Sequence, residues 1–362
     1  MVATGRQYGP RILVVGCGAI GGTVAARLIH QGLDVTALTH NELITDAINA
    51  SGFRTRGELS LGDIAGHGST ALPKNAKPID GVLLATQPPQ VEQAAQQLLP
   101  VLAEDGDMVC FQNGLCEQRI AAIVGLERVI GAVVAWGASM PEPGLYDRTS
   151  AGGFVLGRLD GTLDDRVRTT AHLLEAIGPV TLTDNLPGVR WSKLAINCAI
   201  TSLGAIGGDR LGVLLRKRYV RRLALEIMTE AVDIAFAERI TLEKVAGTLD
   251  LEWLALSESD RKSKLGSTSL LAKHALLLAV GTRYRRLRSS MLTAIERGRE
   301  PAVDFLNGEV VVRGSEHSIV TPINTAVLVD VRRIAAGEIK PGEATLEALF
   351  QRTREAPSHR EG

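Results

Sequence analysis

A glycine-rich turn near the N-terminus has the residue types and spacing that hold a phosphate group. The apolar run at residues 11–15 leads directly into Gly-Cys-Gly-Ala-Ile-Gly at 16–21, and an alanine-rich helical segment follows. The first glycine permits a tight turn, the second lets the backbone approach a pyrophosphate, and the third lets the helix pack on the strand. The free N–H groups of the helix then face the anion. A plain glycine turn is the alternative, but the pattern favours a dinucleotide site that consists of Gly16, Cys17, Gly18, Ala19, Ile20 and Gly21.

A second pair of chemically capable side chains lies near the middle of the chain. Lys193 and Asn197 are four residues apart in an otherwise apolar segment, so on a helix they share one face. An ammonium and a carboxamide there can converge on one polar substrate, and a buried lysine without an obvious local partner tends to have a lowered pKa. In the alternative reading, Lys193 reaches solvent and Asn197 is a cap. Spacing alone leaves both readings open.

Two other polar residues stand at positions that could serve a ligand. Asn113 follows an apparent strand at residues 107–111, and open α/β sheets bind ligands at the carboxyl ends of their strands. An Asn-Gly turn is the alternative reading of Asn113. His274 could supply a proton or bind a ligand, although a single histidine in such a segment more often has a structural role.

The end of the second apparent strand bears on the choice of dinucleotide. An NAD site usually has an acid there for the ribose 2′-hydroxyl. Here the strand ends in Leu38-Thr39-His40-Asn41, and Asp34 lies at its opposite end. Because Thr39 and His40 can donate hydrogen bonds to a phosphate, the sequence favours NADP(H) over NAD(H).

The composition is typical of a two-domain enzyme that acts on a small molecule. The 362 residues are long for one core, and 40 basic residues balance 40 acidic ones, which gives no sign of a polyanionic partner. Aromatic residues are few, so a nucleic-acid surface is not expected. No apolar run is long enough to cross a membrane. The sequence leaves open whether the chain forms a homodimer.

The termini and the cysteines suggest a location. The first ten residues lack a signal-peptide pattern and are expected to be a short disordered lead. The four cysteines show no disulfide or metal-ligand spacing. We therefore expect reduced thiols, no metal site and a cytoplasmic location.

Strands and helices alternate through the first half of the chain and helices alone fill the second. Strand patterns recur at residues 33–38, 80–85, 107–111, 129–136, 154–158 and 180–183, with helical patterns between them and short β-like pieces at 53–71. From Leu186, amphipathic helical segments follow at 189–205, 220–239, 289–297 and 303–313. We expect an α/β protein: an N-terminal Rossmann-type doubly wound parallel sheet (11–184), an all-α C-terminal domain (185–350) and a disordered tail (351–362).

Three motifs together resemble the ketopantoate reductase (2-dehydropantoate 2-reductase) family. They are Gly-Cys-Gly-Ala-Ile-Gly-Gly at residues 16–22, Phe-Gln-Asn-Gly at 111–114, and Trp-Ser-Lys-Leu-Ala-Ile-Asn at 191–197. Weaker matches lie at 289–292, 303–308 and 321–324. The similarity spans residues 11 to about 345.

The resemblance implies an NADP(H)-dependent oxidoreductase that interconverts a ketone or 2-oxo acid and its alcohol. Reduction by hydride needs a proton donor, because alkoxide charge builds on the carbonyl oxygen. By resemblance, Lys193 is this general acid/base, Asn197 donates a hydrogen bond to the substrate, and Asn113 contacts the substrate and the nicotinamide side of the cofactor. Ser290 resembles the serine that binds the substrate carboxylate, although a helix N-cap is the alternative.

Three positions depart from the family pattern. Ala302 stands where a glutamate is usual, Leu287 where an asparagine is usual, and Gln87, which we expect to contact the cofactor, where a lysine is usual. Because these changes remove charge and add apolar surface, we expect a bulkier or less polar substrate than ketopantoate. Glu309, seven residues after Ala302 on the same apparent helix, could supply the missing carboxylate.

A long cationic segment and the altered site leave alternatives open. Residues 257–288 are rich in Lys and Arg and form either a solvated helical face or a rim that attracts an anionic substrate. The chain could instead be a genuine 2-dehydropantoate 2-reductase, a non-catalytic NADP-sensing protein, or an opine-type dehydrogenase. The presence together of Lys193, Asn197 and Asn113 favours an enzyme.

Overall fold

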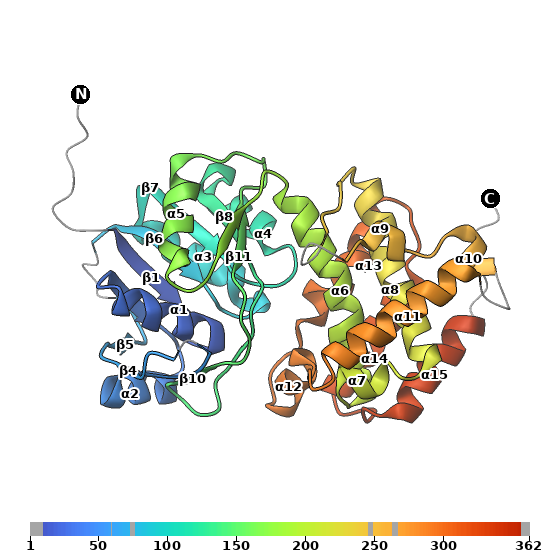
Figure 1. Ribbon diagram of the computed structural model, residues 1–362. Helices are drawn as coiled ribbons and strands as arrows, with labels where there is room; N and C mark the ends of the chain where they lie inside the picture. Colours follow the sequence, from blue (N-terminus) through green and yellow to red (C-terminus); the bar gives the residue numbers. More distant parts are fainter. Residues whose placement is uncertain (1–9, 59, 73–76, 245–248, 263–266, 356–362) are drawn as a thin grey trace. The chain divides into compact units, whose positions relative to one another are not determined.

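The computed structural model describes residues 10–58, 60–72, 77–244, 249–262 and 267–355. The chain divides into two compact units, Met1–Leu186 and Pro187–Gly362 (Figure 1). The expected disordered lead falls almost wholly outside the described residues, as do residues 356–362 of the expected tail. Among the described residues, no helix is long and apolar enough to cross a membrane.

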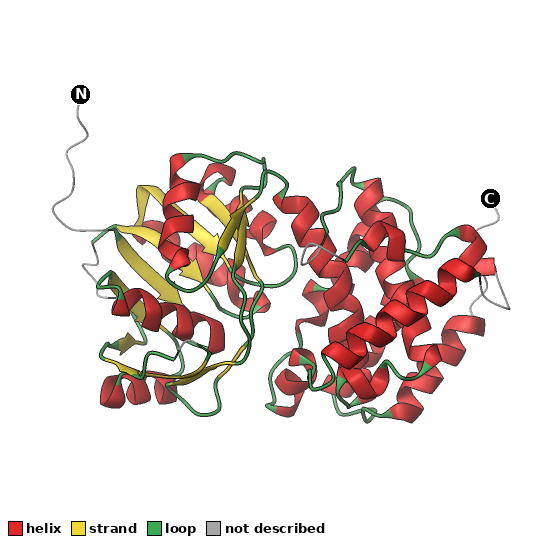
Figure 2. Ribbon diagram, in the orientation of Figure 1, coloured by secondary structure: helices red, strands yellow, loops and turns green. Residues whose placement is uncertain are grey.

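An eight-stranded sheet forms the centre of the first unit (Figure 2). In spatial order its strands are β12 (Val180–Leu182), β11 (Phe154–Gly157), β8 (Val129–Val134), β7 (Leu102–Cys110), β6 (Ile79–Leu84), β1 (Arg11–Val15), β2 (Asp34–Leu38) and β5 (Gly68–Ser69). Among the residues that the structure describes, the helices that accompany it are α1 (Ala19–His30), α2 (Glu42–Ser51), α3 (Val91–Leu98), α4 (Cys116–Val124) and α5 (Asp165–Glu175). Short 3-10 turns occur at Pro88–Gln90, Leu99–Val101 and Leu126–Arg128. The α/β architecture with parallel strands is confirmed.

The central strands form because their side chains are apolar on both faces. In β1, Leu13 and Val14 are fully buried, as expected for a parallel strand covered by helices on both sides. α2 begins where the Asn41 side chain accepts a hydrogen bond from the Ile44 amide. α5 begins in the same way at Asp164. These N-caps satisfy amides that have no partner within the helix.

Two features depart from the expected all-parallel sheet. β11 runs antiparallel to β8, because the chain between them makes an excursion instead of a helical crossover. That excursion contributes β9 (Ala138–Ser139) and β10 (Leu145–Arg148) to a second, four-stranded sheet, in the order β4 (Asp63–Ile64), β3 (Phe53–Gly57), β10 and β9. The expected β-like pieces at 53–71 supply two of these strands, β3 and β4, and also β5 of the large sheet, but the pairing of β3 with β10 was not anticipated.

The second unit is built of helices (Figure 2). They are α6 (Leu186–Gly207), α7 (Leu211–Leu214), α8 (Arg218–Ala237), α9 (Leu251–Leu254), α10 (Glu258–Lys262), α11 (Thr268–Arg283), α12 (Ser290–Glu296), α13 (Asn307–Glu316), α14 (Pro322–Ala335) and α15 (Glu343–Glu355). The expected all-α character is confirmed. Two details are corrected: α15 continues through residues 351–355 of the expected tail, and the helix expected at 303–313 is interrupted.

Candidate functional site

In the first unit, the proposed cofactor residues gather at one edge of the large sheet. The order β7-β6-β1-β2 is parallel throughout, so the carboxyl ends of these four strands lie side by side. Backbone bonds join them just past their ends: the Gly16 amide donates to the Leu38 carbonyl and the Ala85 amide to the Val15 carbonyl. The glycine turn, Thr39, His40, Gln87 and Asn113 all follow these ends. This is the edge at which open α/β sheets bind ligands.

Glycine is required at each of the three positions of the turn for a different steric reason. Gly16 has a φ of +92°, and a Cβ there would lie 2.8 Å from backbone atoms of Ala85. A Cβ on Gly21 would lie 1.9 Å from the Gly16 carbonyl oxygen. A Cβ on Gly18 would meet nothing within 4 Å, so the space above this residue is open to a ligand. The three positions match the turn, packing and approach roles that a pyrophosphate site requires.

The start of α1 also suits an anion. In the described part of the chain, no side chain caps α1 at Gly18, so its first amides are available to a phosphate. Ala19 and Ile20 are half-buried at this start. Burial raises the pKa of the Cys17 thiol to about 12, and its sulfur lies 3.7 Å from the Leu38 carbonyl oxygen. Cys17 can therefore serve a ligand only through its backbone.

A tyrosine from the second sheet braces the turn. The Tyr146 hydroxyl donates to the Cys17 carbonyl oxygen at 3.2 Å, and its ring stacks on Phe53 at 5.9 Å between centroids. A Cβ on Gly22 would lie 1.9 Å from the Tyr146 ring, which explains the extra glycine after the motif. Tyr146 was not predicted from the sequence, because no local pattern indicates that β10 packs on α1.

The other edge residues differ in exposure. Thr39 is buried and accepts from the Asn41 amide, whereas the His40 side chain is exposed. Gln87 is exposed, and its backbone amide donates to the Gln90 side-chain oxygen at 3.4 Å at the start of the turn Pro88–Gln90. Asn113 is exposed after β7, and its carbonyl accepts from the Cys116 thiol. His40, Gln87 and Asn113 thus remain accessible to a ligand.

In the second unit, Lys193 and Asn197 lie one turn apart on α6, and both are half-buried. Thr201 continues the same stripe one turn later and donates its hydroxyl to the Asn197 carbonyl at 2.6 Å. The Asn197 position rules out the cap reading, because it lies in the middle of a 22-residue helix.

The start of α12 is held beside this stripe. The Ser289 hydroxyl donates to the Thr201 carbonyl at 2.6 Å and accepts from the Leu292 amide. Ser289 is therefore the N-cap, and the N-cap reading of Ser290 is wrong. Ser290 is the first helical residue and its side chain is exposed. The start of α12, which carries Ser290, is thus held against α6 one turn past Asn197.

The positions that depart from the family pattern lie in different environments. Leu287 is 44% exposed and Ala302 is half-buried. Ala302 lies in a 3-10 turn, Ala302–Phe305, which the backbone at Leu306 separates from α13. Glu309 is therefore not on one helix with Ala302. Its carboxylate accepts from the Arg313 Nε at 2.8 Å, and Arg313 also binds Glu238 at 2.6 Å.

In the cationic segment at residues 257–288, only some of the described side chains are exposed to solvent. Lys273 is buried and its ammonium binds the Asp260 carboxylate at 2.6 Å. Burial alone would raise the pKa of Asp260, but hydrogen bonds from Lys273, Ser267 and Ser257 lower it to about 2. The side chains of Arg283, Arg285, Arg286 and Arg288 are exposed, whereas those of Arg261, Lys262 and Lys264 lie outside the described residues.

His274 is unsuited to proton donation. It is 7% exposed, and burial, with the nearby Arg221, Arg218 and Arg222, lowers its pKa to about 4. The imidazole is therefore neutral near neutral pH. Among the described residues, no group of three or more His, Cys, Asp and Glu side chains could hold a metal ion.

A buried polar network fixes the middle of α6. The Asn307 amide donates to the Cys198 carbonyl at 3.2 Å and to the Asn324 side chain at 2.9 Å. Glu230 accepts from the Ile323 and Asn324 amides at the start of α14 and from the Asn324 side chain. Asn307 and Asn324, which belong to two of the weaker sequence motifs, thus have a structural role in this network.

Comparison with known proteins covers both units. The sequence profile of the ketopantoate reductase PanE/ApbA family matches residues 12–161, and that of its C-terminal domain matches residues 185–335. The 2-dehydropantoate 2-reductases of Pyrococcus horikoshii and Mesorhizobium japonicum are 26% and 27% identical to the chain. The alignments cover 87% and 90% of this chain and 94% and 98% of those proteins.

Solved structures share the fold. A PanE/ApbA family ketopantoate reductase from Ralstonia eutropha JMP134 matches with a TM-score of 0.74 at 24% identity, covering 90% of this chain and 98% of that one. D-mandelate dehydrogenase in complex with NADH matches with a TM-score of 0.73 at 17% identity, covering 90% and 99%. The chain belongs to the ketopantoate reductase family, whose members are oxidoreductases that act on CH–OH and C=O groups.

Proposed function

We propose that the protein is an NADP(H)-dependent reductase of 2-oxo acids whose preferred substrate is less polar than ketopantoate. The polar stripe on α6 carries the proposal: Lys193 and Asn197 lie one turn apart, and Ser289, the neighbour of Ser290, binds the Thr201 carbonyl one turn further along. A decayed, non-catalytic site has no reason to keep an ammonium, a carboxamide and a hydroxyl together. That argument favours an enzyme over an NADP sensor.

The cofactor would occupy the edge of the large sheet in the first unit. The turn at Gly16, Gly18 and Gly21 would hold the pyrophosphate, Thr39 and His40 the 2′-phosphate, and Asn113 the nicotinamide side. When bound, the cofactor supplies the hydride. Gln87 is a further contact, although it lacks the charge of the usual lysine.

In this proposal, side chains of the protein bind the substrate and transfer the proton. The Ser290 hydroxyl would bind the carboxylate and the Asn197 amide would donate to the substrate. The Lys193 ammonium would give its proton to the carbonyl oxygen, which becomes the hydroxyl of the product, and then regain one from solvent. A positioned acid of this kind contributes roughly 10²–10⁴-fold to the rate.

Substrate choice follows from the missing polar groups. At Ala302 and Leu287 the chain offers methyl and isobutyl groups where the family usually has a carboxylate and an amide. A substrate hydroxyl left without a partner costs ~1–3 kcal/mol. We expect ketopantoate to be reduced less efficiently than 2-oxo acids without a hydroxyl.

A panel of 2-oxo acids, followed by loss of the NADPH absorbance, tests the proposal. We expect turnover of several 2-oxo acids and a lower kcat/KM for ketopantoate, which Ala302→Glu should raise. Ketopantoate preferred over every other compound would identify an ordinary 2-dehydropantoate 2-reductase. Tight NADPH binding with no turnover of any carbonyl would favour the sensor.

A further inference from the structure

A cationic surface follows α11 and continues past α12, and the proposed chemistry does not use it. Residues 283–300 include six arginines and two glutamates, and all eight side chains are exposed. This stretch therefore carries an excess of four positive charges, whereas the whole chain has a net charge of zero. Four of the arginines fall within residues 283–288, which we call the arginine segment. An excess of one sign over so short a stretch produces a local electrostatic field.

Only part of this charge is balanced by neighbouring groups. Arg288 forms an ion pair with Glu296, with 2.6 Å between nitrogen and oxygen, and the Arg283 guanidinium lies over the ring of Tyr284 at 5.8 Å. Within the described part of the chain, the side chains of Arg285 and Arg286 form no ion pair or hydrogen bond. Their charge therefore acts on molecules that approach from solvent.

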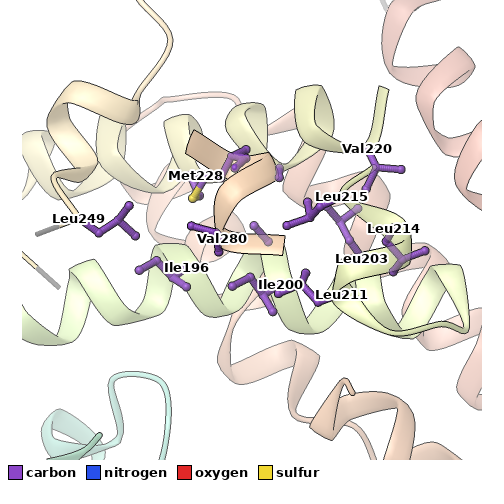
Figure 3. Close-up of a pocket in the computed structure, with 13 residues that line it drawn as sticks. Ile196, Ile200, Leu203, Leu211, Leu214, Leu215, Val220, Met228, Leu249 and Val280 are labelled. Atoms are coloured by element: carbon purple, nitrogen blue, oxygen red, sulfur yellow. The ribbon is translucent and has the colours of Figure 1, made fainter. Parts of the chain in front are cut away.

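The arginine segment is held against α7. The Leu211 amide of α7 donates to the Leu287 carbonyl at 2.9 Å. Leu211 and Val280 of α11 line one apolar cavity, shown in Figure 3, so apolar side chains join the end of α11 to α7. A Cβ on Gly212 would lie 2.6 Å from the Cα atom of Arg285, which places the two backbones in close contact. These contacts fix where the arginines begin.

The other end of the segment adjoins a residue that we assign to the substrate. Ser289 directly follows the segment and is bonded to the Thr201 carbonyl of α6, one turn past Asn197. Because each residue of a chain spans at most about 3.6 Å, the Cα atom of Arg286 lies within about 14 Å of that of Ser290. The Debye length is about 30 Å at 0.01 M salt and about 10 Å at 0.1 M. The field of the segment therefore reaches Ser290 in dilute salt.

We propose that the arginine segment attracts anionic substrates to Ser290 by its charge, without contacting them. The inference rests on the proposed function, in which Ser290 binds the carboxylate of a 2-oxo acid, and it adds a specificity-determining element outside that site. Such a field raises the local concentration of anions, and hence kcat/KM, while the chemical step and kcat do not depend on it. An uncharged carbonyl compound gains nothing from the field.

Double variants that place different charges at the same two positions test the proposal. Arg285→Lys/Arg286→Lys keeps both charges, Arg285→Gln/Arg286→Gln removes them, and Arg285→Glu/Arg286→Glu reverses them. In dilute salt and saturating NADPH, kcat/KM for pyruvate should be unchanged in the Lys pair, about threefold lower in the Gln pair and about threefold lower again in the Glu pair. In about 1 M salt, where the Debye length is about 3 Å, the parent and the three variants should agree.

Methyl pyruvate is the matched control, because it has nearly the shape of pyruvate and no charge. Its kcat/KM should be equal in the parent and the three variants. The kcat for pyruvate should also stay constant, which reports that each variant folds. A loss in the Lys pair as large as that in the Gln pair would indicate a specific guanidinium contact and overturn the proposal. Equal values for pyruvate across the series in dilute salt would overturn it as well.

Binding separates this inference from the proposed function. Calorimetric titration with oxamate, an anionic analogue of pyruvate, in the presence of NADP needs no turnover. An oxamate affinity that falls from the Lys pair to the Gln pair to the Glu pair in dilute salt would support the field even if no 2-oxo acid were reduced. Equal oxamate affinity in all of these proteins would reject the inference even if pyruvate were reduced.

Discussion

Gly18 and Gly21 show how one residue type serves two physical needs in the same turn. A Cβ on Gly21 would collide with the Gly16 carbonyl, whereas a Cβ on Gly18 would enter open space. Gly21 therefore serves the fold, and Gly18 serves an approaching ligand.

This difference predicts the behaviour of Gly18→Val. The variant should fold, with a melting temperature close to that of the parent, because a Cβ at this position would meet no atom within 4 Å. It should lose NADPH binding, since the new side chain fills the pyrophosphate path. Calorimetric titration of NADPH measures this, and undiminished binding would refute the cofactor assignment.

His40 offers a second prediction at the residue scale. Its side chain is exposed just past β2, where the 2′-substituent of a dinucleotide is expected. His40→Asp would repel a 2′-phosphate and accept from a 2′-hydroxyl, so the ratio of NADPH to NADH affinity should fall at least tenfold. His67→Asp, an equal change at another exposed histidine of the same unit, is the control. An unchanged ratio would show that His40 does not face the 2′-position.

At the scale of elements, buried polar groups join helices that are distant in sequence. Glu230 of α8 accepts two amides at the start of α14, and Asn324 and Asn307 carry the network on to α6. Burial raises the pKa of Glu230 to about 7, despite the hydrogen bonds from Asn324 and Ile323 that act in the opposite direction. The folded state therefore binds a proton on Glu230 that the unfolded state has largely lost above pH 5.

The sign of this linkage gives a testable pH dependence. The stabilisation from Glu230 is fully present below its ordinary pKa of 4.5 and is lost as the pH rises through about 7. The free energy of unfolding of the parent, minus that of Glu230→Gln, should fall by roughly 2–3 kcal/mol between pH 4.5 and 8.

His274→Gln is the control of opposite sign. Its pKa is lowered to about 4, so the fold favours the neutral imidazole. The difference between the parent and this variant should rise with pH between about 4 and 6.5. A flat difference for Glu230→Gln would contradict the raised pKa of Glu230.

The elements also show where sequence reasoning reaches its limit. Apolar runs and the glycine turn are local signals, and they predicted the central strands and the first helix. The pairing of β3 with β10 joins Arg54 to Leu145, and no local pattern signals a contact across that distance. The helix expected at 303–313 breaks because the backbone at Leu306 (φ −118°, ψ −93°) is not helical.

The candidate site was likewise predictable where it depends on local spacing and not where it depends on tertiary contacts. Lys193 and Asn197 were placed on one helix face from their spacing, and the structure has them on α6. The role of Ser289 was missed, because two adjacent serines give no local sign of which one caps α12. Tyr146 and Glu230 were missed because their contacts depend on tertiary packing.

At the scale of the whole molecule, the two compact units carry different parts of the chemistry that we propose. The first offers an anion the start of α1, which no described side chain caps, and the open space at Gly18. The second carries the half-buried Lys193 and Asn197 one turn apart on α6. The central claim is that these serve one reaction, in which Lys193 supplies the proton for reduction of a 2-oxo acid.

Chemical rescue of Lys193→Ala tests that claim most directly. With NADPH and a 2-oxo acid that the parent reduces, we expect the variant to lose about 10²–10⁴-fold in kcat with unchanged NADPH affinity. Added ethylammonium should restore part of the rate in proportion to its concentration, whereas tetraethylammonium, which has no proton to give, should not. Turnover of Lys193→Ala at the parent rate without any amine would contradict the account.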